Sequence, residues 1–85
     1  MPSKTVVVGS SVGLHARPAA IISEAAGDLD VEVTLAVEGE EPVDAASSLL
    51  IMTLGAACGD SVEVTSDDQA AVDAIAALVE QDLDA

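Results

Sequence analysis

The sequence has 85 residues, of which 51% are hydrophobic and none is aromatic, so any core must be built from small aliphatic side chains. A chain of this length forms one compact domain, and we expect a single domain over residues 1–85. Its 16 acids against 2 bases give a formal net charge of −14, which opposes binding to nucleic acid or to an anionic membrane surface. Without aromatic side chains there is also no platform for stacking bases.

The cysteine content and the first residues indicate a cytoplasmic protein. A single cysteine, Cys58, cannot form an intramolecular disulfide or a cysteine-rich zinc site. Residues 1–8 lack the basic and then apolar layout of a secretion signal, and no apolar run approaches the roughly 20 residues that span a bilayer. We therefore expect no membrane insertion. The acidic stretch at 28–32 is not a calcium loop, because the glycine that such a loop needs does not follow it. No metal and no cofactor are expected.

The charge is distributed unevenly along the chain. Residues 1–27 contain one acid, Glu24, beside both bases, Lys4 and Arg17, and the only histidine, and carry a net charge of +1. Residues 28–85 carry −15. Two interpretations stay open: either acids are excluded from a segment rich in core positions, or this segment keeps a positive patch for an anion.

The overall charge also bears on the host. Such an excess destabilises a compact fold by self-repulsion unless salt screens it. We interpret the composition as that of a protein from a halophilic cell, and an acidic protein of a mesophile is the alternative.

Four segments are predicted to be strands. Thr5–Val8 is a short β-branched run, and residues 31–37 alternate apolar and polar side chains with a period of two. A turn at 38–40 leads to a third strand over 41–45, which Pro42 places at an edge of the sheet. Residues 61–65 alternate in the same way and form the fourth strand.

Three segments are predicted to be helices. Residues 16–26 are rich in alanine and end at a glycine stop, Gly27. Residues 47–54 form a shorter helix before Gly55. Ser66 and Gln69 predict a capping box for a third helix. Its apolar side chains recur at helical spacing at Val72, Ile75, Ala76 and Val79.

The resulting order is β-α-β-β-α-β-α, which indicates an α+β fold. This split β-α-β plan gives an open-faced β-sandwich, with a four-stranded, mostly antiparallel sheet and three helices on one face.

The segment from Gly13 to Pro18 lies where a loop enters the first helix. Free backbone N–H groups and the positive end of the helix dipole make such a place suited to an anion. Near neutral pH, His15 offers a neutral ring nitrogen as a nucleophile, and Arg17 can hold phosphoryl oxygens at two points. A lone histidine at a helix start is usually a cap or a surface residue, but Arg17 and Pro18 beside it favour phosphoryl transfer.

The run Gly13-Leu14-His15-Ala16-Arg17-Pro18-Ala19 resembles the signature of the histidine-containing phosphocarrier protein (HPr) family, part of the phosphoenolpyruvate-dependent sugar phosphotransferase system. A second block, residues 47–55, resembles the serine-led short helix of that family. The two blocks and the predicted order of elements extend the resemblance over nearly the whole chain.

This resemblance implies a phosphoryl carrier and not an enzyme. The δ1 nitrogen of His15 would accept a phosphoryl group from enzyme I, which phosphoenolpyruvate charges, and pass it to a IIA component of a sugar permease. Arg17 and the amides at Ala16 and Arg17 would stabilise the transferring charge next to Pro18, without a metal. We expect the carrier to be a monomer.

The short second helix carries apolar side chains around more of its circumference than a core contact requires. It is either buried all round or it presents a docking surface, and the resemblance implies a surface made of Ala20, Ser48, Leu49 and Met52. Ser47 stands where many members of the family are phosphorylated by a kinase. It is also a natural helix N-cap, which is the interpretation we favour.

Two other classes of function remain open. One is a carrier or regulatory module that serves dihydroxyacetone phosphorylation, or nitrogen or carbon control, in place of sugar uptake. The other is a scaffold without phosphoryl chemistry, which would take up no phosphoryl label.

Overall fold

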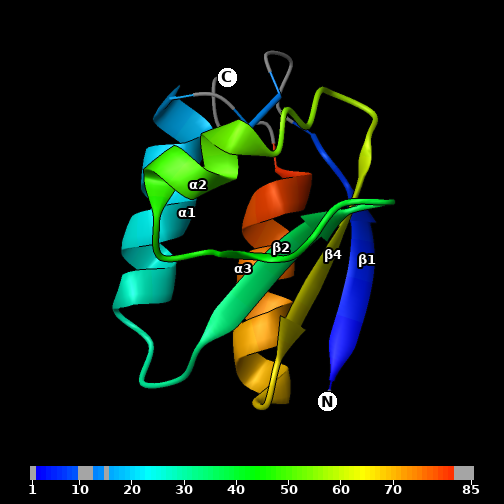
Figure 1. The fold of residues 1–85 in the computed structure, drawn as a ribbon. Coiled ribbons are helices and arrows are strands. Elements are labelled where there is room, and N and C mark those ends of the chain that lie inside the picture. The colour runs from blue at the N-terminus through cyan, green and yellow to red at the C-terminus, as the bar shows by residue number, and fades with distance from the viewer. Residues whose placement is uncertain (1, 10–12, 15, 82–85) are drawn as a thin grey trace.

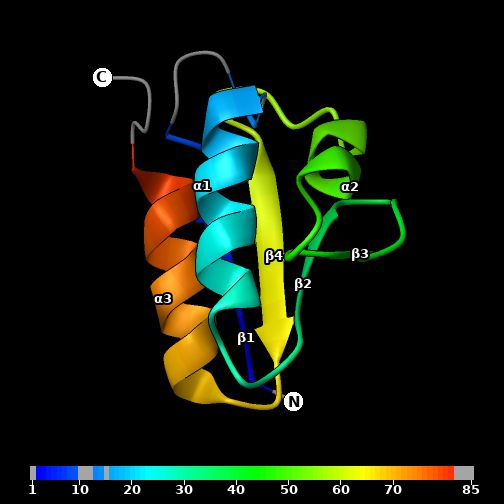
Figure 2. The same ribbon diagram turned by 90° about the vertical axis from the view of Figure 1, so that its left-hand side faces the viewer.

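The computed structural model describes residues 2–9, 13–14 and 16–81 of the chain. Within them the elements follow in the order β1 (Ser3–Val7), α1 (Ala16–Gly27), β2 (Val33–Val37), β3 (Val43–Asp44), α2 (Ser48–Thr53), β4 (Ser61–Ser66) and α3 (Gln69–Glu80). The four strands form one sheet in the order β1-β4-β2-β3, with every neighbouring pair antiparallel. The helices cover one face of this sheet, as Figures 1 and 2 show, so the predicted open-faced β-sandwich is confirmed.

The pairings of β4 with β1 and with β2 show why apolar and polar side chains alternate along the strands. Val62 and Val64 of β4 are fully buried, and they pair with Val6 of β1 and Leu35 of β2 on the side that faces the helices. Glu63, between the two valines, is exposed on the opposite side. Because side chains of a strand alternate between faces, one face of the sheet becomes core and the other stays open to water.

The large side chains of the core between sheet and helices are all aliphatic. Its fully buried larger side chains come from every layer: Ile22 of α1, Leu35 of β2, Ile51 of α2, Val62 and Val64 of β4, and Val72, Ile75 and Val79 of α3. Burying each of them contributes about 1.5–3 kcal/mol. The helical spacing predicted for the third helix is therefore confirmed, since those apolar positions face the core.

The third strand is an edge strand, as Pro42 predicted. It is shorter than the expected 41–45, because only Val43 and Asp44 pair with β2. Pro42 has no N–H to donate, so the ladder cannot extend through it.

The predicted capping box of the third helix is wrong. Ser66 is the last residue of β4 and is buried, and its hydroxyl donates to the Glu32 carbonyl oxygen (2.7 Å). Asp68 caps α3 instead, since its carboxylate accepts from the Ala70 N–H (3.0 Å). The side chain of Gln69 turns forward to donate to Asp73 (3.0 Å).

The first helix ends at Gly27 as predicted, but without the left-handed geometry of a glycine cap. Gly27 is the last residue of α1 itself, and it is not among the glycines with positive φ. The left-handed glycine lies after α2, where Gly55 has φ +65° and its N–H donates to the Met52 carbonyl (3.2 Å). The bounds of α1 and α2 otherwise agree with the expected ranges to within one residue.

Candidate functional site

α1 begins at Ala16, so the residue before it, His15, stands next to the helix N-terminus in the chain. His15 itself lies outside the described residues. Ala16 and Arg17 are exposed, while Pro18 is buried in the first turn. Arg17 is helical although it precedes a proline, a position where helical geometry is disfavoured. The missing N–H of Pro18 costs nothing in the first turn, where N–H groups have no intrahelical acceptor.

The first turn of α1 carries no acidic side chain. The exposed Arg17 guanidinium and the positive end of the helix dipole therefore face solvent without a carboxylate of that turn to offset them. Lys4 does not reinforce this charge, because it is the second residue of β1, and β1 starts at the end of the molecule opposite the start of α1 (Figure 1). Among the described residues, the positive patch suggested by residues 1–27 is formed by the Arg17 side chain and the backbone N-terminus of α1.

The chain just before residue 15 is tightly held. Leu14 is 2% exposed, and its N–H donates to the Ala56 carbonyl oxygen (2.9 Å) in the segment that follows α2. Gly13 has φ +75°, a conformation that residues with a Cβ rarely adopt. No local pattern in the sequence indicates that residue 56 supports this loop, because the contact joins distant segments of the chain.

α2 is not buried all round. Ile51 is fully buried, whereas Leu49 is 68% exposed and Leu50 40% exposed. Ala20 on α1 is exposed too, and α1 and α2 pack against each other (Figure 2). Of the two interpretations of the second helix, the structure therefore favours the exposed apolar surface over complete burial.

The composition of this surface differs in part from the expected one. Ser48 is half-buried, and Met52 is half-buried because it packs against the core. Leu50 was not among the predicted docking residues although it is exposed next to Leu49. Helical spacing could not have found it, because positions 50 and 52 lie at equal angles on either side of Ile51.

Ser47 is the N-cap of α2. It has extended backbone geometry, and its hydroxyl accepts from the Leu50 N–H (3.3 Å). This confirms the capping role that the sequence favoured.

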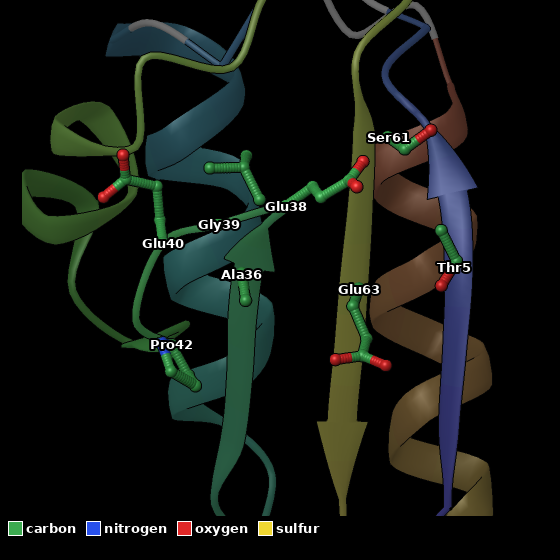
Figure 3. Close-up of a pocket in the computed structure, with 9 residues that line it drawn as sticks. Thr5, Ala36, Glu38, Gly39, Glu40, Pro42, Ser61 and Glu63 are labelled. Carbon is green, nitrogen blue, oxygen red and sulfur yellow. The ribbon is translucent and has the colours of Figure 1, made fainter.

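A hollow of about 490 Å³ lies on the open face of the sheet, away from the helices (Figure 3). It is lined by the hydroxyls of Thr5 and Ser61 and by three carboxylates, Glu38, Glu40 and Glu63. These carboxylates repel an anion, so the hollow cannot serve as the phosphate site. In the part of the chain that the structure covers, no group of three or more histidine, cysteine or acidic side chains could hold a metal ion. Nor, in the same part, is any helix long and apolar enough to cross a membrane.

Comparison with known proteins decides the family. A family model described as the phosphorylation site of the PTS HPr component matches residues 2–81. The chain belongs to the HPr family. It is a phosphocarrier of the phosphotransferase relay and not an enzyme.

Individual relatives agree over almost the full length. The HPr of Streptomyces coelicolor is 41% identical over 87 residues, which cover 99% of this chain and 94% of that protein. The phosphocarrier protein NPr of Shewanella violacea is 36% identical and covers 95% and 91% of the two chains. The crystal structure of an HPr from Bacillus anthracis superposes with a TM-score of 0.85 at 31% identity, covering 92% of this chain and 95% of that one.

Proposed function

We propose that this HPr family member accepts a phosphoryl group on His15 from phosphorylated enzyme I and donates it to a IIA component of a sugar permease. The observation that carries this proposal is the start of α1 directly after residue 15, with Arg17 exposed and Pro18 buried in a first turn free of acids. The carrier works in the cytoplasm as a monomer, and it needs no metal or cofactor.

In the proposed step the lone pair of His15 Nδ1 attacks the phosphorus of the enzyme I phosphohistidine. A new N–P bond forms as the N–P bond to the enzyme I imidazole breaks, and the departing ring keeps that electron pair. In the second transfer His15 is the donor: a group on the IIA component attacks the phosphorus, and the N–P bond to His15 breaks. No oxidant, reductant or proton donor enters the balance.

Arg17 and the N–H groups of Ala16 and Arg17 stabilise the charge on the transferring oxygens. Charge-assisted, two-point contacts from a guanidinium suit phosphoryl oxygens. First-turn amides are preorganised donors, so their alignment costs no reorganisation at the moment of transfer. Pro18 contributes by fixing the first turn, because its buried ring restricts φ.

Docking uses the apolar surface beside α1, made of Ala20, Ser48, Leu49 and Met52. To these we add Leu50, on the basis of its exposure. Met52 suits a surface that must fit two different partners, because its side chain is flexible and polarizable. Phosphorylation of Ser47 would place a dianion beside this surface at the N-terminus of α2, where the helix end tolerates negative charge.

The test is phosphorylation by phosphoenolpyruvate and enzyme I, followed by intact-mass measurement. We expect a mass gain of one phosphoryl group that is labile in acid and stable in base, and none with the His15→Ala variant. Equal labelling of His15→Ala would refute the site. The absence of label in the parent chain would favour a scaffold without phosphoryl chemistry.

A second candidate is a carrier for a branch other than sugar uptake, such as nitrogen control or dihydroxyacetone phosphorylation. The 36% identity to a protein named NPr supports keeping it. Transfer from His15 to purified IIA components of each branch separates the two, because the true acceptor should be labelled fastest.

We also propose a salt-adapted host. The relatives give no support to this, and the proposal rests on the net charge of −14 alone. A salt-adapted chain of this charge should gain stability as the salt concentration rises, because mobile ions screen its self-repulsion.

A further inference from the structure

The backbone on the N-terminal side of residue 15 rests on the loop that follows α2. A Cβ on Gly13 would lie 2.4 Å from the Ala56 carbonyl oxygen and 2.9 Å from the Ala57 Cα, both of them backbone atoms that cannot rotate away. The next residue, Leu14, donates its N–H to the same Ala56 oxygen. Residues 13 and 14 are therefore in direct contact with the 56–57 backbone.

That loop is in turn braced by one side chain. The Asp60 carboxylate accepts from the Ala57 N–H (2.9 Å), and the Asp60 N–H donates to the Ala57 carbonyl (2.9 Å). Two more bonds tie the loop to the end of β1: Val8 donates to the Asp60 carbonyl (2.9 Å), and Gly59 donates to the Val8 carbonyl (3.0 Å). Asp60 is exposed, so its side chain contributes to this bonding and not to the core.

The C-terminal side of residue 15 is fixed independently. α1 starts at Ala16, and the buried Pro18 and Ala19 hold its first turn in the molecule. Residue 15 therefore stands in the chain between two supports. One is α1, and the other is the loop braced by Asp60, which acts through Ala57, Ala56 and Leu14.

We propose that Asp60 and Gly13 are positioning residues for phosphoryl transfer, because they set the place of the residue 15 backbone relative to the first turn of α1. This inference rests on His15 being the phosphoryl acceptor. Asp60 acts as a hydrogen-bond acceptor and not through its charge. Its negative charge would oppose an incoming phosphoryl group, so a gain in rate on removing it would indicate an electrostatic role, and a loss indicates a positioning role.

Two variants test the proposal, one at Asp60 and one at Gly13, and the chain offers a matched control for each. Asp60→Ala deletes the acceptor of the Ala57 N–H, and Asp60→Asn keeps an oxygen there. The control is Asp68→Ala, which also removes an exposed carboxylate with one backbone N–H partner. Asp68 is the N-cap of α3, whose start lies at the far end of the molecule from the first turn of α1 (Figure 1).

Gly13→Ala forces the 56–57 backbone to move. Its control is Gly39→Ala, because Gly39 has a similar positive φ (+84°) and no atom within 4 Å of an added Cβ. Both variants place an alanine at a positive φ, but only Gly13→Ala pushes a Cβ against the 56–57 backbone. A larger loss of kcat in Gly13→Ala than in Gly39→Ala is therefore due to that contact.

The measurements are kcat and KM for transfer from phosphorylated enzyme I, together with the NMR ring-proton signals of the imidazole, which are unique because the chain has one histidine. For Asp60→Ala we expect kcat to fall about tenfold with KM nearly unchanged, since a misplacement of about 1 Å can cost about 100-fold and the docking surface is untouched. The imidazole signals should shift. Asp60→Asn should restore most of the rate, and both control variants should match the parent chain in rate and signals.

The proposal would be overturned if kcat and the imidazole signals of Asp60→Ala equalled those of the parent chain. It would also be overturned if Asp68→Ala lost as much kcat as Asp60→Ala. If Gly13→Ala fails to fold, the Asp60 series decides alone. If enzyme I does not phosphorylate His15 in the parent chain, the proposed function fails. In that case the NMR signals still test whether Asp60 positions residue 15: the imidazole signals should shift in Asp60→Ala and not in Asp68→Ala.

Discussion

Single residues at the start of α1 determine what the site can do. Arg17 is the exposed cation of a first turn that has no acid, and it lies two positions after the proposed phosphoryl acceptor. Pro18 keeps this turn helical and buried on one side, which leaves Arg17 on the outer side. The sequence placed both residues at the start of the first helix, and they lie in the first turn of α1.

The first prediction concerns the guanidinium of Arg17. Arg17→Ala should lower kcat for transfer by about 10- to 100-fold, comparable with the loss of one preorganised donor to a developing charge. Arg17→Lys should recover part of the rate, because it keeps the charge and loses two-point contact. Rapid-quench transfer from phosphorylated enzyme I measures both. A rate for Arg17→Ala equal to that of the parent chain would remove the assigned role.

Two serines that precede helices have different tasks. Ser47 caps α2, whereas Ser66 ends a strand and joins the Glu32 carbonyl to the Asp68 N–H. The sequence could not separate them, since each is a serine close before a predicted helix. Tertiary pairing of β4 with β2 decides the difference, because it places Ser66 opposite Val33 in the sheet.

The second prediction separates these tasks by stability. Ser47→Ala should lower the free energy of unfolding by about 1 kcal/mol through loss of the cap, and Ser47→Asp should retain most of it. Ser66→Ala should cost about 1–3 kcal/mol, because it leaves a carbonyl and an N–H without their partner. Urea unfolding measures both. An Asp at 47 that destabilises as much as an Ala would show that the 3.3 Å contact contributes nothing.

At the scale of elements, α2 shows how a six-residue helix can serve core and surface at once. Its single fully buried side chain, Ile51, anchors it to the core, while Leu49 and Leu50 are exposed. The sequence showed an excess of apolar residues but not their orientation. Met52 is expected outside, but it packs partly against the core.

The third prediction uses two substitutions of similar size in α2. Ile51→Ala should destabilise the fold by about 2–5 kcal/mol. Leu49→Ala should change stability by less than about 0.5 kcal/mol, because the side chain is already exposed. If the proposed docking surface is correct, Leu49→Ala should raise KM for enzyme I without changing kcat. Unaltered KM in Leu49→Ala and in Leu50→Ala would place docking elsewhere.

At the scale of the whole molecule, electrostatic repulsion between acids adds to the loss of conformational entropy that opposes folding. The acids concentrate after residue 27, and the open face of the sheet collects three of them around one hollow (Figure 3). Like charges held this way repel each other, and mobile ions weaken that repulsion. The aliphatic core has no aromatic side chains to add to its buried area, so repulsion weighs heavily on stability.

The fourth prediction is that the melting temperature rises with salt. From about 0.1 M to about 1 M KCl the screening length falls from about 10 Å to about 3 Å, which should weaken repulsion across the molecule. A variant with Glu38→Gln, Glu40→Gln and Glu63→Gln should melt above the parent chain in dilute buffer, and the difference should vanish at high salt. A constant difference, or a melting point of the parent that does not rise, would contradict the role of repulsion and the salt-adapted host.

The sequence by itself determined the class of fold, the position of the helices and most strands, and the motif from Gly13 to Pro18. These depend on local signals: alternation, helical spacing, and a proline whose geometry acts within its own turn. Only the tertiary structure decided that Ser66 belongs to the sheet, that Leu50 faces out, and that Ala56 and Asp60 support the chain before residue 15. The reason is physical, since each of these depends on a partner from a distant part of the chain, and local patterns carry no information on which backbone will lie opposite.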